Sequence, residues 1–135
     1  MKKILIIEDD TKIAAALAIR LEAAGYSVIT APDGLAGLKQ ALEIKPDLIL
    51  MDIWMPVGLG FSDAQRLQSL GLHHVPIIFI TASKIKGLRR TAEKLGAVAF
   101  FEKPYDSEEL LAAVGEALKK NKAPHESETP VNALA

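Results

Sequence analysis

The chain has 135 residues, of which 50% are hydrophobic and 24% charged, with a formal net charge of −1. This composition is typical of one globular domain, and the near-neutral charge gives no reason to expect direct binding to nucleic acid or to a membrane. The absence of cysteine excludes a disulfide scaffold and a thiol nucleophile, and it fits a reducing, cytoplasmic location.

The two ends of the chain carry few structural signals. The first apolar run covers only residues 4–7 and stops at three acidic residues, so it predicts a strand rather than a signal peptide. No apolar run is long enough to span a bilayer. Residues 123–135 have no hydrophobic periodicity, and we expect a disordered tail there. Residues 1–122 form one predicted domain, and we expect no attached DNA-binding or enzymatic domain.

Strands and helices alternate along this domain. In chain order, short apolar runs predict five strands, at residues 4–7, 26–30, 48–52, 75–81 and 97–101. Apolar residues at helical spacing predict five helices, at residues 13–24, 35–42, 61–70, 84–95 and 107–122. Gly25, Gly71 and Gly96 mark three helix ends, and Ser83 is the predicted N-cap of the fourth helix. The alternation predicts an α/β fold in which a parallel sheet has helices on both faces.

Several of the predicted strands end on reactive side chains. Asp52 ends a run that is almost wholly apolar, which is typical of a strand buried on both faces. Glu8 and Asp9 follow the first strand, Thr81 ends the fourth, and Lys103 follows the fifth. Each has an ordinary explanation as a helix start, a strand residue or a loop residue. Parallel strands, however, bring all of these ends to one edge, where ligands bind in open α/β sheets.

Carboxylates gathered at one edge predict a cation. They repel one another and raise their own pKa values unless a positive charge joins them. Few protein ligands and room for water favour Mg²⁺ over Ca²⁺. A cation beside a carboxylate, a hydroxyl and a lysine suits phosphoryl transfer, in which a carboxylate can be the nucleophile. The three histidines, His73, His74 and His125, have no partner at metal-ligand spacing.

Short motifs occur in a fixed order along the chain. They are Glu8-Asp9, Met51-Asp52, Met55-Pro56, Thr81-Ala82, Gly96-Ala97 and Lys103-Pro104. In this order they resemble the receiver domain of bacterial two-component response regulators, over roughly residues 2–121. The resemblance implies a (βα)₅, flavodoxin-like, doubly wound parallel sheet with strand order 2-1-3-4-5. It also implies a stand-alone, phosphorylation-dependent signalling switch in a two-component system or phosphorelay, not a metabolic enzyme.

The resemblance assigns the metal and phosphoryl sites. It implies that Asp52 accepts a phosphoryl group from a phosphohistidine of a sensor histidine kinase or a histidine phosphotransfer protein. Asp9 and Asp52 would bind Mg²⁺ directly, and Glu8 would act mainly through water. The backbone carbonyl of Trp54 would be a further ligand.

The resemblance also assigns the residues that contact and sense the phosphoryl group. Lys103 would contact that group and would be joined to Pro104 by a cis bond. Thr81 would move toward the phosphate, and Phe100 would follow it inward as the second member of a switch pair. Phe100 lacks the hydroxyl of the commoner tyrosine, so its buried and exposed positions should differ more in energy.

Two further features depart from the commoner family pattern. The loop after Met55-Pro56 reads Val57-Gly58-Leu59-Gly60, without the usual acidic or amide residue. The predicted fourth helix begins with a group of basic residues, Lys84, Lys86, Arg89 and Arg90. We expect an acidic output protein to dock near this group and Phe100, and a merely solvated face is the alternative.

Other functions fit the residues less well. A pseudo-receiver that docks partners without phosphorylation is the main alternative, but docking needs none of the five polar residues at the strand ends. A haloacid-dehalogenase-type phosphatase would have a second aspartate where Trp54 stands. A flavodoxin-like flavin carrier would need a phosphate-binding loop where residues 8–10 are acidic, and these acids would repel the phosphate.

Overall fold

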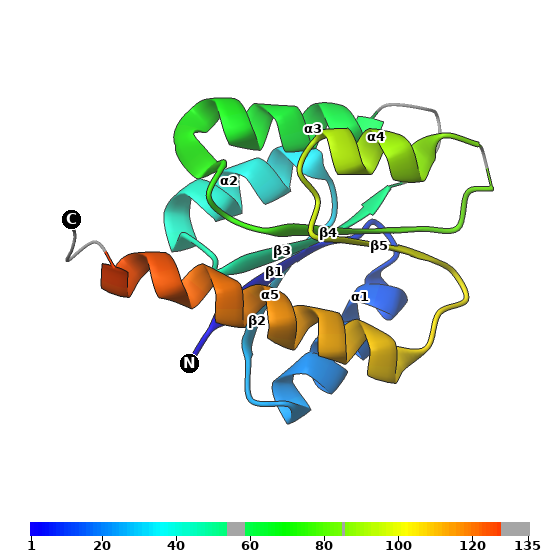
Figure 1. Ribbon diagram of the computed structural model, residues 1–135. Coiled ribbons are helices and arrows are strands. Elements are labelled where there is room, and N and C mark those ends of the chain that lie inside the picture. The colour runs from blue at the N-terminus through cyan, green and yellow to red at the C-terminus, as the bar shows by residue number, and fades with distance from the viewer. Residues whose placement is uncertain (54–58, 85, 128–135) are drawn as a thin grey trace.

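A computed structural model describes residues 1–53, 59–84 and 86–127 (Figure 1). Five parallel strands form a sheet in the order β2-β1-β3-β4-β5. Their bounds are β1 (Lys3–Ile7), β2 (Ser27–Ala31), β3 (Leu48–Ile53), β4 (Ile77–Thr81) and β5 (Ala99–Glu102). The predicted α/β class and strand order are confirmed.

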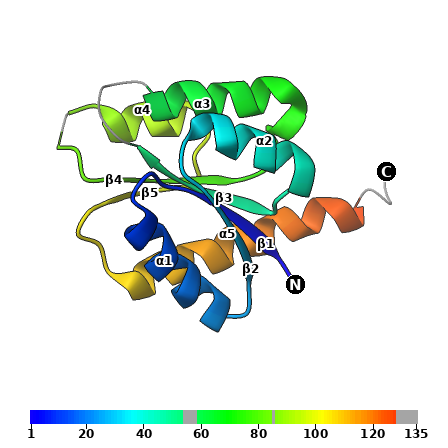
Figure 2. The same ribbon diagram turned by 180° about the vertical axis from the view of Figure 1, so that it is seen from behind.

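Helices cover both faces of the sheet. On one face lie α1 (Thr11–Ala23) and α5 (Ser107–Ser127), and on the other lie α2 (Gly34–Ile44), α3 (Leu59–Leu67) and α4 (Leu88–Lys94) (Figure 1, Figure 2). Helix α3 continues into a short π-helical turn, η1 (Gln68–Leu72), which ends the helix where Gly71 adopts a φ of 91°. Within the described residues, no helix has both the length and the apolar character needed to cross a membrane.

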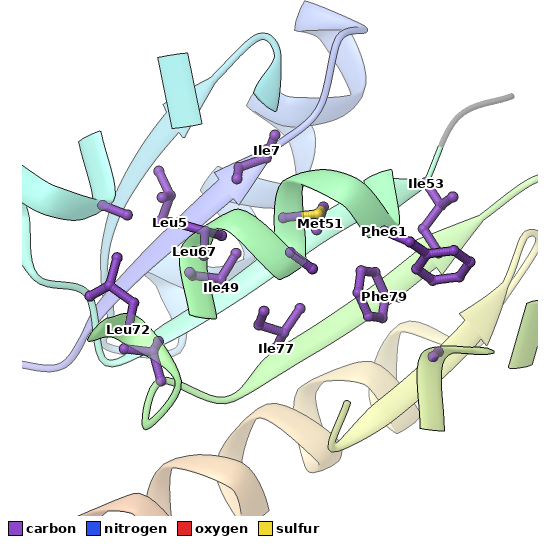
Figure 3. Close-up of a cluster of buried hydrophobic side chains, with 14 of the residues drawn as sticks. Leu5, Ile7, Ile49, Met51, Ile53, Phe61, Leu67, Leu72, Ile77 and Phe79 are labelled. Carbon is purple, nitrogen blue, oxygen red and sulfur yellow. The ribbon is translucent and has the colours of Figure 1, made fainter. Parts of the chain in front are cut away.

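The core has two layers because side chains alternate between the faces of each strand. Leu5, Ile49 and Phe79 belong to the layer under α2, α3 and α4 (Figure 3). Ile4 and Ile78 belong to the layer under α1 and α5.

Strands β1 and β3 are also hydrogen-bonded to a neighbour on each side. The carboxyl ends of these two central strands are therefore held firmly in place.

The main difference from the sequence-based prediction lies between β4 and α4. The fourth helix begins at Leu88, not near Lys84, and Gly87 precedes it with a φ of 91°. The backbone N–H of Ser83 donates to the Thr81 hydroxyl at 3.0 Å, and this is a local turn. The prediction that Ser83 caps the fourth helix is therefore wrong, because a left-handed glycine separates the two.

Helix α5 also differs from its expected length. It continues to Ser127, whereas the sequence pattern placed its end near Lys122. The expected tail boundary at 123 thus falls within the helix. Residues 128–135 lie outside the described residues, and for them disorder stays a prediction.

Candidate functional site

The carboxyl ends of the strands border an open cleft of about 440 Å³. Its lining consists of Glu8, Asp9, Asp10, Ile13, Asp52, Ile53, Ala82, Ser83 and Lys103. The two acidic residues after β1, the aspartate of β3 and the lysine after β5 thus lie together, although 95 positions separate the first from the last. A cleft with this much negative charge and one ammonium group can bind a cation.

Three carboxylates form the floor of the cleft. Glu8 and Asp9 follow β1 directly, Asp52 lies in β3, and one carboxylate oxygen from each lies within 4.8 Å of the other two. Glu8 is only 6% exposed, and its Oε2 accepts the backbone N–H of Asp10 at 3.0 Å. Asp10 has a structural role, because its Oδ1 accepts two backbone N–H groups in the first turn of α1.

Lys103 lies between Glu8, which follows β1, and Asp52 of β3. Its Nζ lies 3.4 Å from Oε1 of Glu8 and 3.4 Å from Oδ2 of Asp52. Burial works against the charge of Lys103, but the negative charges of Asp52 and Glu8 outweigh it and raise the pKa of the lysine. Burial, followed by the neighbouring Asp52, raises the pKa of Glu8 to about 7, against the effect of the Asp10 N–H. The single ammonium group of Lys103 therefore does not neutralise the carboxylates of Glu8, Asp9 and Asp52, and the site keeps an excess of negative charge.

The donor set fits the expected Mg²⁺ ion. Oδ1 of Asp52 is buried and has no hydrogen-bond partner among the described residues. A buried carboxylate oxygen without a partner is costly, and a bound cation removes that cost. Three carboxylates in an open cleft leave room for the water ligands that Mg²⁺ retains. Trp54, the source of the expected carbonyl ligand, lies outside the described residues.

The two residues of the expected switch, Thr81 and Phe100, are both buried. Thr81 is 0% exposed, and its hydroxyl donates to the carbonyl oxygen of Ile53 at 2.9 Å while accepting the Ser83 N–H. It does not line the cleft in this structure. Phe100 is 7% exposed and packs in the core layer under α4, with the guanidinium of Arg89 over its ring. The Lys103–Pro104 bond is cis.

Five residues of the cleft were not singled out as site residues from the sequence: Asp10, Ile13, Ile53, Ala82 and Ser83. Ala82 and Ser83 directly follow the end of β4, so their position at the carboxyl edge was the available signal. Ile13 is 39% exposed and lies in the first turn of α1. Assigning Asp10 as the N-cap of that helix would have placed Ile13 beside the acidic residues.

Comparisons with known proteins agree with this arrangement. The family model described as "Response regulator receiver domain" matches residues 4–115. The chain is 38% identical over 126 residues to the DNA-binding dual master transcriptional regulator RpaA of Synechocystis sp., covering 89% of this chain and 50% of that protein. It is 36% identical over 120 residues to the alkaline phosphatase synthesis transcriptional regulatory protein PhoP of Bacillus subtilis, with the same two coverages. The chain thus spans about half the length of these curated relatives.

A solved structure gives the same picture. The response regulator receiver domain protein (CheY-like) from Methanospirillum hungatei JF-1 superposes with a TM-score of 0.84 at 27% identity, covering 92% of this chain and 98% of that one. The family match runs from β1 into α5 and contains every described residue that lines the cleft. The chain therefore belongs to the response regulator receiver domain family.

Proposed function

We propose that the chain is a phosphorylation-dependent signalling switch whose phosphoacceptor is Asp52. The observation that carries this proposal is the contact of Asp52 with Lys103, at 3.4 Å, beside two further carboxylates in an open cleft. Such a group brings a nucleophilic carboxylate, a site for a cation and a fixed ammonium group to one point. Its role is signalling, not metabolic catalysis.

The reaction transfers a phosphoryl group from a phosphohistidine of a sensor histidine kinase or a histidine phosphotransfer protein. One carboxylate oxygen of Asp52 attacks the phosphorus, the P–N bond to the donor imidazole breaks, and the imidazole leaves as its nitrogen takes up a proton. Lys103 then moves its hydrogen bonds toward the phosphoryl oxygens, where its positive charge stabilises the added negative charge.

We propose that Mg²⁺ binds between Asp9 and Asp52, with Glu8 acting through water and the Trp54 carbonyl as a further ligand. When bound, the metal supplies positive charge to the phosphoryl oxygens. The carboxylates of this chain would hold that charge in place, and Glu8 itself is only 6% exposed.

Thr81 is the residue best placed to sense the new phosphoryl group. Phosphorylation adds about −1.5 to −2 charges and strong acceptor oxygens. A phosphoryl oxygen competes with the Ile53 carbonyl for the Thr81 hydroxyl, and this competition shifts a two-state equilibrium. The resemblance adds an inward movement of Phe100, but in this structure Phe100 already lies in the core.

The output partner is proposed to dock on the basic patch, which consists of Lys84, Lys86, Arg89 and Arg90. The first two residues precede α4 and the last two lie on it, and all four are exposed. Lys84 also reaches β5, where its Nζ donates to the Lys103 carbonyl at 3.3 Å. The patch therefore adjoins Phe100 through Arg89 and Lys103 through Lys84. An acidic partner would be attracted to its positive charge. A pseudo-receiver that only docks partners is the weaker proposal, because docking does not require the part-buried ion pairs of Lys103 with Glu8 and Asp52.

Phosphorylation can be tested with Mg²⁺ and acetyl phosphate, read by intact mass. We expect the gain of one phosphoryl group, which is lost in base, and no gain in Asp52→Asn. Asp10→Asn is the matched control, because it changes a carboxylate of the same cleft while asparagine still caps α1. Equal labelling of the Asp52→Asn protein would refute the assignment.

A further inference from the structure

Arg89 covers the ring of Phe100. The guanidinium carbon lies 4.9 Å from the ring centroid, which is within the range of a cation–π interaction. Arg89 is the second residue of α4, and Phe100 is the second residue of β5. The ring also packs in the core layer that contains Leu88 and Ala92 of the same helix. Phe100 is therefore enclosed by the helix on one side and the sheet on the other.

The burial of Phe100 does not require a shift of Thr81. Phe100 is 7% exposed while the Thr81 hydroxyl still donates to the Ile53 carbonyl, 2.9 Å away, and has not turned to Asp52. Phenylalanine has no hydroxyl, so no polar group draws its ring toward solvent. Core packing and the guanidinium both favour the buried position, and neither depends on Asp52.

We infer that Arg89 is a positioning residue that clamps Phe100 in the buried position in both the unphosphorylated and phosphorylated states. This inference rests on the proposed function, in which Asp52 is phosphorylated. Phosphorylation would then alter the backbone that follows Thr81, starting with the Ser83 N–H that the threonine hydroxyl now accepts. The aromatic ring would not move in response to phosphorylation. The part of the docking surface formed by Arg89 and Phe100 would therefore already have its final structure in the unphosphorylated protein.

The clamp can be tested by ¹⁹F NMR on protein labelled with 4-fluorophenylalanine. The chain has four phenylalanines, and the Phe100 signal is identified by its loss in Phe100→Leu. Broadening by a soluble gadolinium chelate measures how exposed the ring is. The full chain is compared with and without Mg²⁺ and beryllofluoride, which stands in for the phosphoryl group.

In the unsubstituted protein we expect the same weak broadening of the Phe100 signal in both states. Arg89→Met keeps a long apolar side chain but removes the cation, so the exposed population should rise about 2- to 5-fold without beryllofluoride. Arg89→Lys should restore part of the protection. Arg90→Met is the matched control and should change nothing, because Arg90 is an exposed arginine next in sequence for which no ring contact or ion pair occurs among the described residues.

Two results would overturn the clamp. One is a Phe100 signal in the unsubstituted protein that becomes clearly better protected when beryllofluoride is added, which would show an inward movement. The other is an Arg89→Met protein that behaves like Arg90→Met. Failure of the proposed function would look different, because no acyl phosphate would form on Asp52 with acetyl phosphate, while the comparison without beryllofluoride would still decide whether Arg89 holds the ring.

Discussion

Asp52 lies in β3 and Lys103 directly follows β5, 51 positions later in the sequence, and the lysine Nζ lies 3.4 Å from Oδ2 of the aspartate. The ammonium group of Lys103 is thus close enough to stabilise negative charge that is added at Asp52. Because Lys103 also contacts Glu8 at 3.4 Å, it links the first and third strands of the sheet to the end of the fifth. The positive charge of Lys103 also reduces the repulsion between the neighbouring carboxylates of Glu8 and Asp52.

Lys103→Met should slow the phosphorylation of Asp52 by acetyl phosphate. A hydrogen bond to a charged group is worth about 1.5–3 kcal/mol, so the expected loss in rate is about 10- to 100-fold. Intact mass over a time course measures this rate. Lys84→Met is the control, since Lys84 contacts the Lys103 carbonyl but neither Glu8 nor Asp52. An unchanged rate in Lys103→Met would remove the lysine from the reaction.

The stability of the metal-free protein should fall as the pH rises from about 4.5 to about 7. The pKa of Glu8 is raised from 4.5 to about 7, so the folded state binds the proton more tightly than the unfolded state does. The stabilisation from the protonated form is complete below pH 4.5 and is lost as pH passes through 7. The shift corresponds to at most about 3 kcal/mol. Urea unfolding at several pH values, without divalent metal, measures it.

Glu8→Gln should flatten this pH dependence, because glutamine does not titrate. Glu93→Gln, at an exposed position of α4, should leave it unchanged. If Glu8→Gln and the unsubstituted protein lose the same free energy of unfolding between pH 5 and pH 8, another group is responsible. Protons should also compete with Mg²⁺, so its affinity should increase as the pH rises through 7.

The prediction for Mg²⁺ uses the single tryptophan of the chain, Trp54. Its carbonyl is a proposed metal ligand, so binding of Mg²⁺ should change the indole fluorescence. Asp9→Asn should move the titration midpoint to higher Mg²⁺ concentration, and Asp10→Asn should not. A constant fluorescence signal, with binding shown by calorimetry, would place the metal elsewhere.

The fold and the floor of the site follow from the sequence because both depend on local patterns. Short apolar runs define buried strands, and the residue at which each run stops is delivered to the same edge. The start of α4 could not be obtained in this way. Ser83 looked like a helix cap, but its N–H is taken by the side chain of Thr81, and Gly87 has a left-handed conformation that only tertiary context selects. The contact of Arg89 with Phe100 likewise depends on how α4 packs on β5.

Reversing charge on the basic patch should weaken the binding of an acidic output partner. Such a partner can be found by pull-down with and without beryllofluoride. With Lys86→Glu and Arg90→Glu together, we expect slower association and a weaker dependence on salt, because steering by charge is lost. The labelling of Asp52 should stay intact. Lys2→Glu with Lys39→Glu is a control of equal net charge away from the patch, and equal effects of the two pairs would mean that the patch is only a solvated face.

The Thr81 hydroxyl and the central strands differ in how firmly they are held. Glu8 follows β1, Asp52 lies in β3 and Thr81 lies in β4, and each of these strands is paired on both sides. The Thr81 hydroxyl, in contrast, is oriented by single hydrogen bonds to the Ile53 carbonyl and from the Ser83 N–H. Substitutions between Ser83 and α4 can therefore change how strongly phosphorylation alters partner binding without changing the rate of phosphoryl transfer. Different parts of the chain thus determine how much phosphorylation changes partner affinity and how fast the phosphoryl group is transferred. Natural variation can change one of these properties while the other stays the same.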